Sequence, residues 1–551
     1  MKYRQTCTRA AAITLVAVLG MAVAQAADGG RTAPLFDDLG THHVPVTTTV
    51  SQAQRYFDQG VILAYGFNHA EAVRSFREAQ RLDPTCAMCF WGEALALGPN
   101  INKPMDPADA PQAVAAVKQA ERLAGPTTPR EQALIAALGR RYVDPAPADR
   151  SALDRAYADA LAAVVADHPD DLDAATFYAE ALMDLMPWAY YTETGEAKPQ
   201  TEQVTSILEG ILARNPDHPG AIHLYIHAVE ASATPERAVA GADRLGDLVP
   251  GSGHLVHMPS HIYLRVGRYH DATRANERAS KADESYINQC RVQGFYPALY
   301  YPHNIHFIWY TASLEGRSAV AIEAARKLAD NVPVDLIADI PLIEQFLVVP
   351  LFGHIRFARW DDVLAEVQPR AEHRFATGMW HAARGIAYSA KGLQDEAEAE
   401  RAAFVAAAAA YGPDAYEKYG YPADVLQRIA GQLLDAGIAG NNGDDAALIT
   451  ALEQAVALED GLPYMEPPYW FFPNRPLLGA ALLARGRAVE AEAVFRRDLE
   501  KVPHNGWSLD GLAASLAAQG RAAEASAVRA QFDVAWQRAD VTLGKTGIQP
   551  Y

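Results

Sequence analysis

Histidines concentrate in one part of this sequence, where their spacing could bring several imidazoles together. Eight of the 17 histidines lie between His223 and His306, far more than an even distribution would place there. Within three short segments they are three or four residues apart, which puts side chains on one face of a helix. The seven candidates for a shared site are His223, His227, His254, His257, His261, His303 and His306.

Imidazole is the commonest side-chain ligand for transition metals, so these spacings have a specific chemical meaning. A helical H-x-x-x-H pair can give one ion two ligands. No matching set of carboxylates accompanies the imidazoles, which argues against calcium and magnesium and favours copper, zinc or iron. The alternative is a polar groove for a peptide or acidic partner, with some of the histidines satisfied in the core.

Other polar residues lie near these histidines. Glu230, one helical turn after His227, is a candidate metal ligand, imidazole-orienting partner or general base; a solvated helix residue is the alternative. Tyr310 is a second candidate for catalysis or substrate binding, and Tyr263, Tyr300 and Tyr301 are more simply explained by aromatic packing. We expect His270 to be structural. No set of residues dictates a reaction type, so the sequence leaves enzymatic activity open.

An internal repeat organises most of the chain. Its clearest copy spans residues 53–86 and contains, in order, Tyr56, Gly60, Ala72, Phe76, Ala79 and Pro84. A second copy contains Leu478, Gly479, Ala491, Phe495 and Pro503. These residues resemble the tetratricopeptide repeat, in which small residues let two helices approach, aromatic rings fill the gap, and a proline ends the second helix.

The resemblance implies an all-α fold, a right-handed α-solenoid of antiparallel helix pairs covering residues 51–540. Abundant alanine and the lack of alternating hydrophobicity agree with it. In that family the second, fifth and ninth places of each first helix line the concave groove, and the seven histidines fall in such places on three successive helices. The family alone implies an interaction scaffold that binds a protein or peptide in this groove; the histidines favour a metal site, with a small-molecule substrate as a further possible occupant.

The two ends of the chain have other expected roles. Residues 1–26 combine Lys2, Arg4 and Arg9 with a short apolar run and a small-residue cleavage site, which predicts a signal peptide and an exported protein, periplasmic or secreted, without stable membrane insertion. We expect residues 27–50 to form an extended arm, flexible at His42 and His43 unless these fold into the groove. Residues 541–551 are expected to be a C-terminal tail.

Charge and cysteine content exclude some functions. The formal net charge of −19, which loss of residues 1–26 would make more negative by three, disfavours nucleic acid as a partner. No nucleotide-binding motif occurs, so no nucleotide cofactor is expected. Cys86 and Cys89 form a C-x-x-C pair that could be a structural disulfide, a redox site or a metal site.

Overall fold

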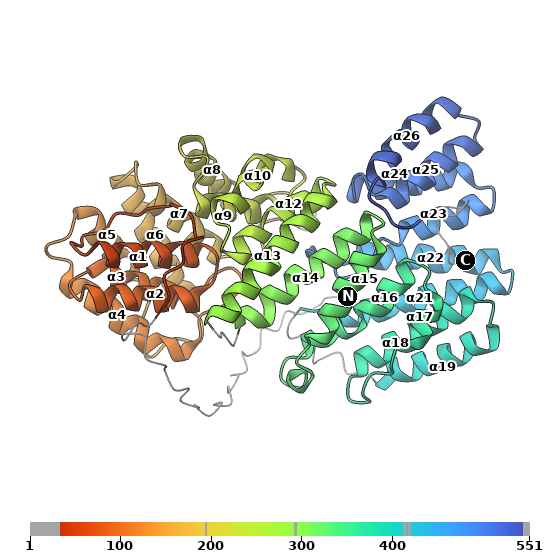
Figure 1. Ribbon diagram of the computed structural model, residues 1–551, viewed down its shortest axis with the longest axis horizontal. Coiled ribbons are helices and arrows are strands. Elements are labelled where there is room, and N and C mark those ends of the chain that lie inside the picture. Colours follow the sequence, from red (N-terminus) through yellow and green to blue (C-terminus); the bar gives the residue numbers. More distant parts are fainter. Residues whose placement is uncertain (1–32, 193–194, 291–294, 411–415, 417–419, 544–551) are drawn as a thin grey trace, which may run out of the picture. The chain divides into compact units, whose positions relative to one another are not determined.

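The computed structural model describes residues 33–192, 195–290, 295–410, 416 and 420–543 (Figure 1). Throughout these residues the chain forms helices and no strand, so the predicted all-α class is confirmed. The expected signal peptide and all but the first three residues of the expected tail lie outside the described residues. The chain divides into a first unit, residues 1–228, and a second unit, residues 229–551.

Successive helices of the first unit pack as neighbours: α1 with α2, α3 with α4, and α7 with both α6 and α8. Short turns join most of them, so paired helices run antiparallel (Figure 1). The helices are α1 (Ser51–Tyr65), α2 (His69–Leu82), α3 (Ala87–Ala96), η1 (Pro107–Asp109), α4 (Ala110–Leu123), α5 (Pro129–Leu138), α6 (Ser151–Asp167), α7 (Leu172–Asp184), α8 (Pro199–Arg214) and α9 (Pro219–Val229).

The second unit repeats this arrangement, with α13 on α14, α18 on α19, α21 on α22, α23 on α24 and α25 on α26. Its helices are η2 (Pro235–Ala238), α10 (Val239–Leu248), α11 (Gly253–His257), α12 (Pro259–Arg265), α13 (Tyr269–Cys290), α14 (Phe295–Leu314), α15 (Ser318–Asp330), η3 (Val334–Leu336), η4 (Pro341–Val348), α16 (Val349–Arg356), α17 (Trp360–Ala365), α18 (Arg374–Ala390), α19 (Gln394–Ala410), α21 (Ala423–Asn441), α22 (Asp445–Asp460), α23 (Arg475–Ala484), α24 (Ala488–Lys501), α25 (Gly506–Ala518) and α26 (Ala522–Ala535).

The repeat residues pack as the tetratricopeptide resemblance implies. The ring of Phe76 on α2 lies between Gly60 of α1 and Gly92 of α3, and a Cβ atom added to either glycine would lie 2.6 or 2.3 Å from that ring. Phe495 of α24 lies in the same way against Gly479 of α23 and Gly511 of α25. Each aromatic ring therefore occupies space that two glycines leave open, and the helix pairs form a tetratricopeptide-like α-solenoid.

The segment 33–50 contains no helix, and it is packed against the first unit instead of forming a flexible arm. Asp58 of α1 accepts hydrogen bonds from the backbone N–H of Val44 (3.0 Å) and from His43 (2.8 Å). Thr47 donates its backbone N–H to Glu131 of α5 at 2.6 Å. These bonds satisfy polar groups that water would otherwise solvate, which is why the expectation of flexibility at His42 and His43 is wrong.

Two smaller features bear on the sequence expectations. Cys86 and Cys89 form a disulfide at the start of α3, and both side chains are buried. Of the helices described, none is at once long enough and apolar enough to cross a lipid bilayer.

The glycine contacts generate a stability prediction. Gly92→Ala places a methyl group 2.3 Å from the Phe76 ring, so we expect the free energy of unfolding to fall by about 1–3 kcal/mol in denaturant titrations followed by circular dichroism. Gly210→Ala in α8 is the matched control, because no atom lies within 4 Å of the added carbon. It should raise stability by about 0.5–1 kcal/mol. Equal effects of the two changes would contradict the packing described.

Candidate metal centre

Three of the predicted ligands meet in the second unit. His257 ends α11, His261 lies in α12, and His303 lies in α14; one ring nitrogen from each lies within 4.8 Å of the other two. His257 and His261 keep the four-residue spacing of one helix face across Pro259, which opens α12 without breaking the helical backbone at Met258. Both α11 and α12 pack on α13, and α11 also packs on α14. The predicted helical spacing therefore does bring these imidazoles together.

The protonation of His257 follows from its neighbour Asn276 on α13. The side-chain Nδ2 of Asn276 donates to the carbonyl of Ala272 at 2.9 Å, which fixes the orientation of the amide. The Oδ1 atom must therefore face His257 and accept a hydrogen bond from its Nδ1 at 2.6 Å. In a neutral ring with Nδ1 protonated, the lone pair is on Nε2, the atom that faces the cluster.

His261 is held by two carboxylates. Its Nδ1 donates to Glu230 at 2.5 Å and lies 3.3 Å from Glu466, a residue of the segment between α22 and α23. Burial by itself would lower the pKa of His261, but the charges and hydrogen bonds of Glu230 and Glu466 outweigh it and raise the pKa to about 10. His261 is therefore an imidazolium at neutral pH, and Glu230 is its orienting partner.

The two Nε2 atoms of His257 and His261 are 2.8 Å apart. Because the His257 atom carries a lone pair, the proton between them belongs to His261. That proton occupies the position where a cation could be bound by both rings, and His303 adds a third imidazole beside them. Phe307, whose ring centre lies 4.8–5.1 Å from those of all three imidazoles, closes one side with an apolar surface. The group can thus exchange a proton for a metal ion that prefers nitrogen ligands.

A loop residue covers the carboxylate side of this group. The hydroxyl of Tyr464 contacts Glu466 and lies 3.5 Å from Glu230, and the guanidinium of Arg265 lies over its ring at 5.4 Å. Burial raises the pKa of Glu466, and the neighbouring Glu230 raises it further, against the lowering effect of His261. Tyr464 and Glu466 are far from the histidines in sequence, and no spacing rule could have assigned them to this site.

The other predicted residues of the second unit have different surroundings. The ring of His254 lies 4.8 Å from that of Tyr300. The ring of His306 stacks on Trp309 and meets Phe346, and burial lowers its pKa to about 4. Among the described residues His306 belongs to no group with metal-ligand spacing. Tyr310, the other catalytic candidate, is buried, and burial raises its pKa.

The remaining two predicted ligands belong to the first unit. His223 and His227 are successive turns of α9, with ring centres 4.9 Å apart. The Nδ1 of His223 donates to the carbonyl oxygen of Tyr65 at 2.5 Å, so its lone pair is on Nε2. Phe67 lies 4.5 Å from His223, and Trp188 meets His227 edge-on at 5.2 Å. These two imidazoles therefore form a pair that is flanked by aromatic side chains.

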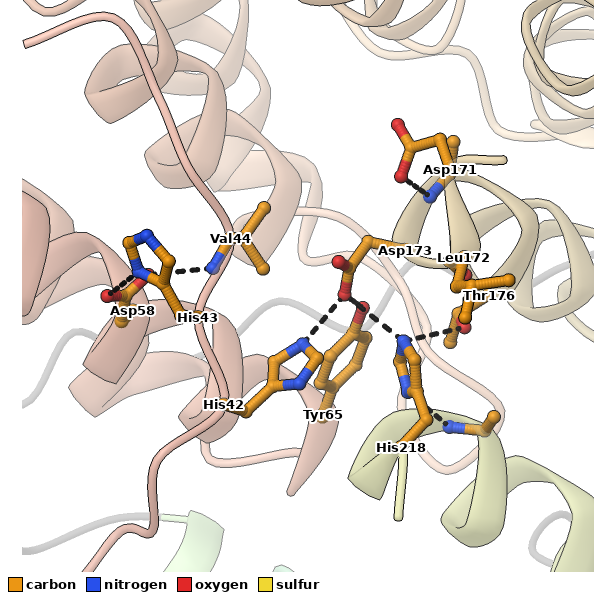
Figure 2. Close-up of polar contacts among 12 residues, drawn as sticks. His42, His43, Val44, Asp58, Tyr65, Asp171, Leu172, Asp173, Thr176 and His218 are labelled. Atoms are coloured by element: carbon orange, nitrogen blue, oxygen red, sulfur yellow. Dashed lines mark hydrogen bonds and ion pairs between the residues drawn. The ribbon is translucent and has the colours of Figure 1, made fainter. Parts of the chain in front are cut away.

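The first unit contains a second polar group that no sequence pattern predicted (Figure 2). The Oδ1 atom of Asp173 on α7 accepts hydrogen bonds from Tyr65 (2.7 Å) and His42 (2.8 Å), and His218 lies 3.2 Å away. The Nδ1 of His218 accepts the backbone N–H of Ala221, so a neutral His218 carries its proton on Nε2 and donates it. The only sequence signal was the position of His218 immediately before the helix-starting Pro219.

This group has metal-ligand spacing, but the positions of its protons are better explained by hydrogen bonds that hold segment 33–50 in place. We call this hydrogen-bonded group the latch. A metal at the Nε2 of His218 would require the ring to give up its bond from Ala221, because a neutral imidazole has only one nitrogen with a free lone pair and Nδ1 already uses it as an acceptor. Burial alone would raise the pKa of Asp173; the hydrogen bonds from His218 and His42 outweigh it and hold that pKa far below its ordinary value. A permanently ionised Asp173 therefore fastens segment 33–50 to α1 and α7.

The latch can be tested by breaking its acceptor. Asp173→Asn removes the charge that holds His42, so amide hydrogen exchange across residues 33–50 should accelerate at least about tenfold. Asp170→Asn is the matched control, because Asp170 is an exposed neighbour that pairs with Arg214 and not with His42. Unchanged exchange in Asp173→Asn would show that other contacts suffice to hold the segment.

The pKa of His261 makes a prediction about pH. A folded-state pKa of about 10, above the ordinary 6.5, means that the folded protein holds an extra proton between these values. This contribution to stability is complete below pH 6.5 and is lost as pH rises towards 10, by up to about 1.4 kcal/mol per pH unit. In Glu230→Gln the NMR-titrated pKa of His261 should fall and the loss of stability from pH 7 to 9.5 should shrink. If the pKa of His261 were unchanged in that variant, Glu230 would not be the residue that raises it.

Comparisons with known proteins give a likeness of architecture only. No protein-family model matches the chain, and no curated protein matches it. Solved structures do match over most of its length: human IFIT1 bound to m7Gppp-AAAA has 12% identity and a TM-score of 0.29, covering 90% of this chain and 92% of that one. Yeast Tom70 has 12% identity and a TM-score of 0.26, covering 89% and 93%. Naa15/Naa10 bound to HypK-THB has 12% identity and a TM-score of 0.20, covering 88% and 70%.

Proposed function

We propose that this chain is an exported tetratricopeptide-like protein that binds a transition metal ion, copper, zinc or iron, through His257, His261 and His303. The observation that carries the proposal is the pair of hydrogen bonds at Nδ1, from His257 to Asn276 and from His261 to Glu230. Together they direct both Nε2 atoms to one point. Partners of this kind fix ring orientation and ligand basicity in metal sites.

The surrounding residues define what the site can do. Asn276 and Glu230 orient the two rings, and Phe307 limits access of water from one side. Glu466 and Tyr464 lie on the Nδ1 side of His261, opposite the Nε2 proton that a metal ion would replace. A bound ion would supply Lewis-acid or redox chemistry there, or be stored and delivered. The protein is thus a metal-dependent enzyme or a metal-binding protein of the cell envelope.

The proposed location depends on the N-terminal sequence. Lys2, Arg4 and Arg9 before an apolar run, followed by Ala24-Gln25-Ala26, support a cleaved signal peptide. We propose that the mature protein comprises segment 27–50, the helical region 51–540 and the tail 541–551. N-terminal sequencing of the exported protein should begin at residue 27.

A scaffold that binds a protein or peptide in its groove, without metal, is the second candidate function. The observation in its favour is segment 33–50, which the first unit holds in extended form through bonds to backbone groups, as at Val44 and Thr47. A helical-repeat surface can bind an extended peptide from another protein in the same manner. Such binding would be insensitive to chelators.

Metal analysis distinguishes the two functions. We expect about one copper, zinc or iron ion per purified chain, lost when His257 and His261 are both replaced by alanine, because each supplies a ligand nitrogen. His306→Ala is the matched control, since His306 lies on the same helix as His303 but packs against Trp309. Binding should release about one proton at pH 7.5, measured by calorimetry in buffers of different ionisation enthalpy. If the purified wild type contained no metal and did not bind added copper, zinc or iron, the metal proposal would be wrong and the interaction scaffold would be the remaining candidate function.

A further inference from the structure

One buried arginine differs from the others in its surroundings. Arg141, Arg356 and Arg475 are the buried arginines of the described residues. Arg141 pairs with Asp184 at 2.6 Å, and Arg475 pairs with Asp460. Arg356, at the end of α16, is only 6% exposed, and no ion pair joins it to any carboxylate that the structure describes. A buried charge is costly unless it is compensated, so this exception calls for a partner.

The unsatisfied atoms of Arg356 have a specific geometry. Its Nε and Nη2 atoms are both buried and have no hydrogen-bond partner among the described residues. These two nitrogens form one edge of the guanidinium, with two parallel N–H donors that match the two oxygens of a carboxylate. The flat faces are already occupied, because the guanidinium carbon lies 3.9 Å from the ring centre of Trp507 and 5.5 Å from that of Phe472.

The nearby acidic side chains of the second unit are committed elsewhere. Glu459 accepts the backbone N–H of Asn474, and Asp498 accepts hydrogen bonds from Ser508 and Asn505. Burial raises the pKa of Glu459 to about 7, so this group carries only part of a negative charge at neutral pH; burial also raises the pKa of Asp498. Burial likewise lowers the pKa of Arg356 to about 9, as expected for a cation whose charge is poorly compensated.

The same unit shows what such an edge normally holds. Arg384 is also stacked on aromatic rings, those of Trp380 at 4.5 Å and Tyr388 at 5.3 Å. Its Nε donates to Glu400 at 2.7 Å and its Nη2 donates to the Tyr388 hydroxyl at 2.9 Å, so both nitrogens that are unsatisfied at Arg356 have acceptors here. Both arginines are stacked on aromatic rings, but Arg384 has a carboxylate partner and Arg356 has none among the described residues.

We propose that Arg356 is the anchor of a binding site for the carboxylate group of a small organic acid. Tyr310 on α14 lies in the neighbourhood of Arg356. Tyr310 follows His303 by seven residues, two helical turns on the same face of α14. An acid held at Arg356 would therefore lie along the helix that carries one of the candidate metal ligands, although the proposal does not require a metal.

Thermal unfolding of the full chain in sodium acetate, sodium phosphate and sodium chloride at equal ionic strength tests this site. Acetate should stabilise the wild type more than chloride or phosphate does, in proportion to its binding. Arg356→Met keeps the stacked volume but removes both donors, and its apparent affinity for acetate should be at least about tenfold weaker. Arg384→Met is the matched control and should keep the acetate response of the wild type.

The unfolding temperatures of the two variants in acetate-free buffer show whether a lost acetate response reflects a folding defect. Arg356→Met should unfold at the same temperature as the wild type or higher, because it removes an uncompensated buried charge. Arg384→Met should unfold at a lower temperature, because it leaves Glu400 without its guanidinium. Equal stabilisation of the wild type by acetate and chloride would overturn the proposal, as would a stronger effect of phosphate or an acetate response that survives in Arg356→Met.

Discussion

The candidate centre depends on the hydrogen bonds at Nδ1 of His257 and His261. Without Asn276 and Glu230, either ring could rotate or change tautomer, and burial would keep His261 neutral. With them, one ring presents a lone pair and the other presents a proton to the same point, 2.8 Å apart. The proposed metal binding would displace that proton, so the affinity would rise with pH up to the pKa of about 10.

Two of the groups with metal-ligand spacing show how the position of the protons distinguishes sites with similar distances. Near His261 a carboxylate accepts from Nδ1 and leaves Nε2 to face other imidazoles. Near His218 the backbone N–H of Ala221 occupies Nδ1, so Nε2 becomes a donor to Asp173. Distances alone would place the two groups in one class. The identity of each Nδ1 partner shows which group leaves Nε2 atoms facing one another and which uses Nε2 to hold a segment of the chain.

The sequence predicted the local part of this architecture and could not predict the rest. Spacings of three and four residues placed His257 and His261 on one face, and the repeat pattern added His303 from the next inner helix. The same pattern included His306, whose ring instead stacks on the buried Trp309 and meets Phe346, because spacing alone does not determine which neighbours a ring packs against. Glu466 could not be anticipated, since it reaches His261 from an irregular segment whose path depends on the packing of α22 and α23.

The turns between paired helices add a constraint that bears on the first unit. Eight described turns share a residue with positive φ, followed by a backbone hydrogen bond to the carbonyl five residues earlier. Six of them use glycine: Gly267, Gly316, Gly392, Gly443, Gly486 and Gly520. The exceptions are Ala358 and Phe67, with φ of 53° and 55°. A left-handed conformation costs a residue with a side chain about 1–2 kcal/mol. It persists only where the contacts of that side chain offset the cost.

At Phe67 the contacts of the side chain offset this cost. Its buried ring packs 4.5 Å from His223 and stacks at 6.0 Å on His227, the imidazole pair of α9. Trp188, which meets His227 from another side, also has a positive φ, of 60°. Two aromatic residues in strained backbone positions thus enclose the same pair of imidazoles. Strain maintained at two independent places around one pair is more consistent with a constraint on those rings than with general packing, since glycine would close either turn at lower cost.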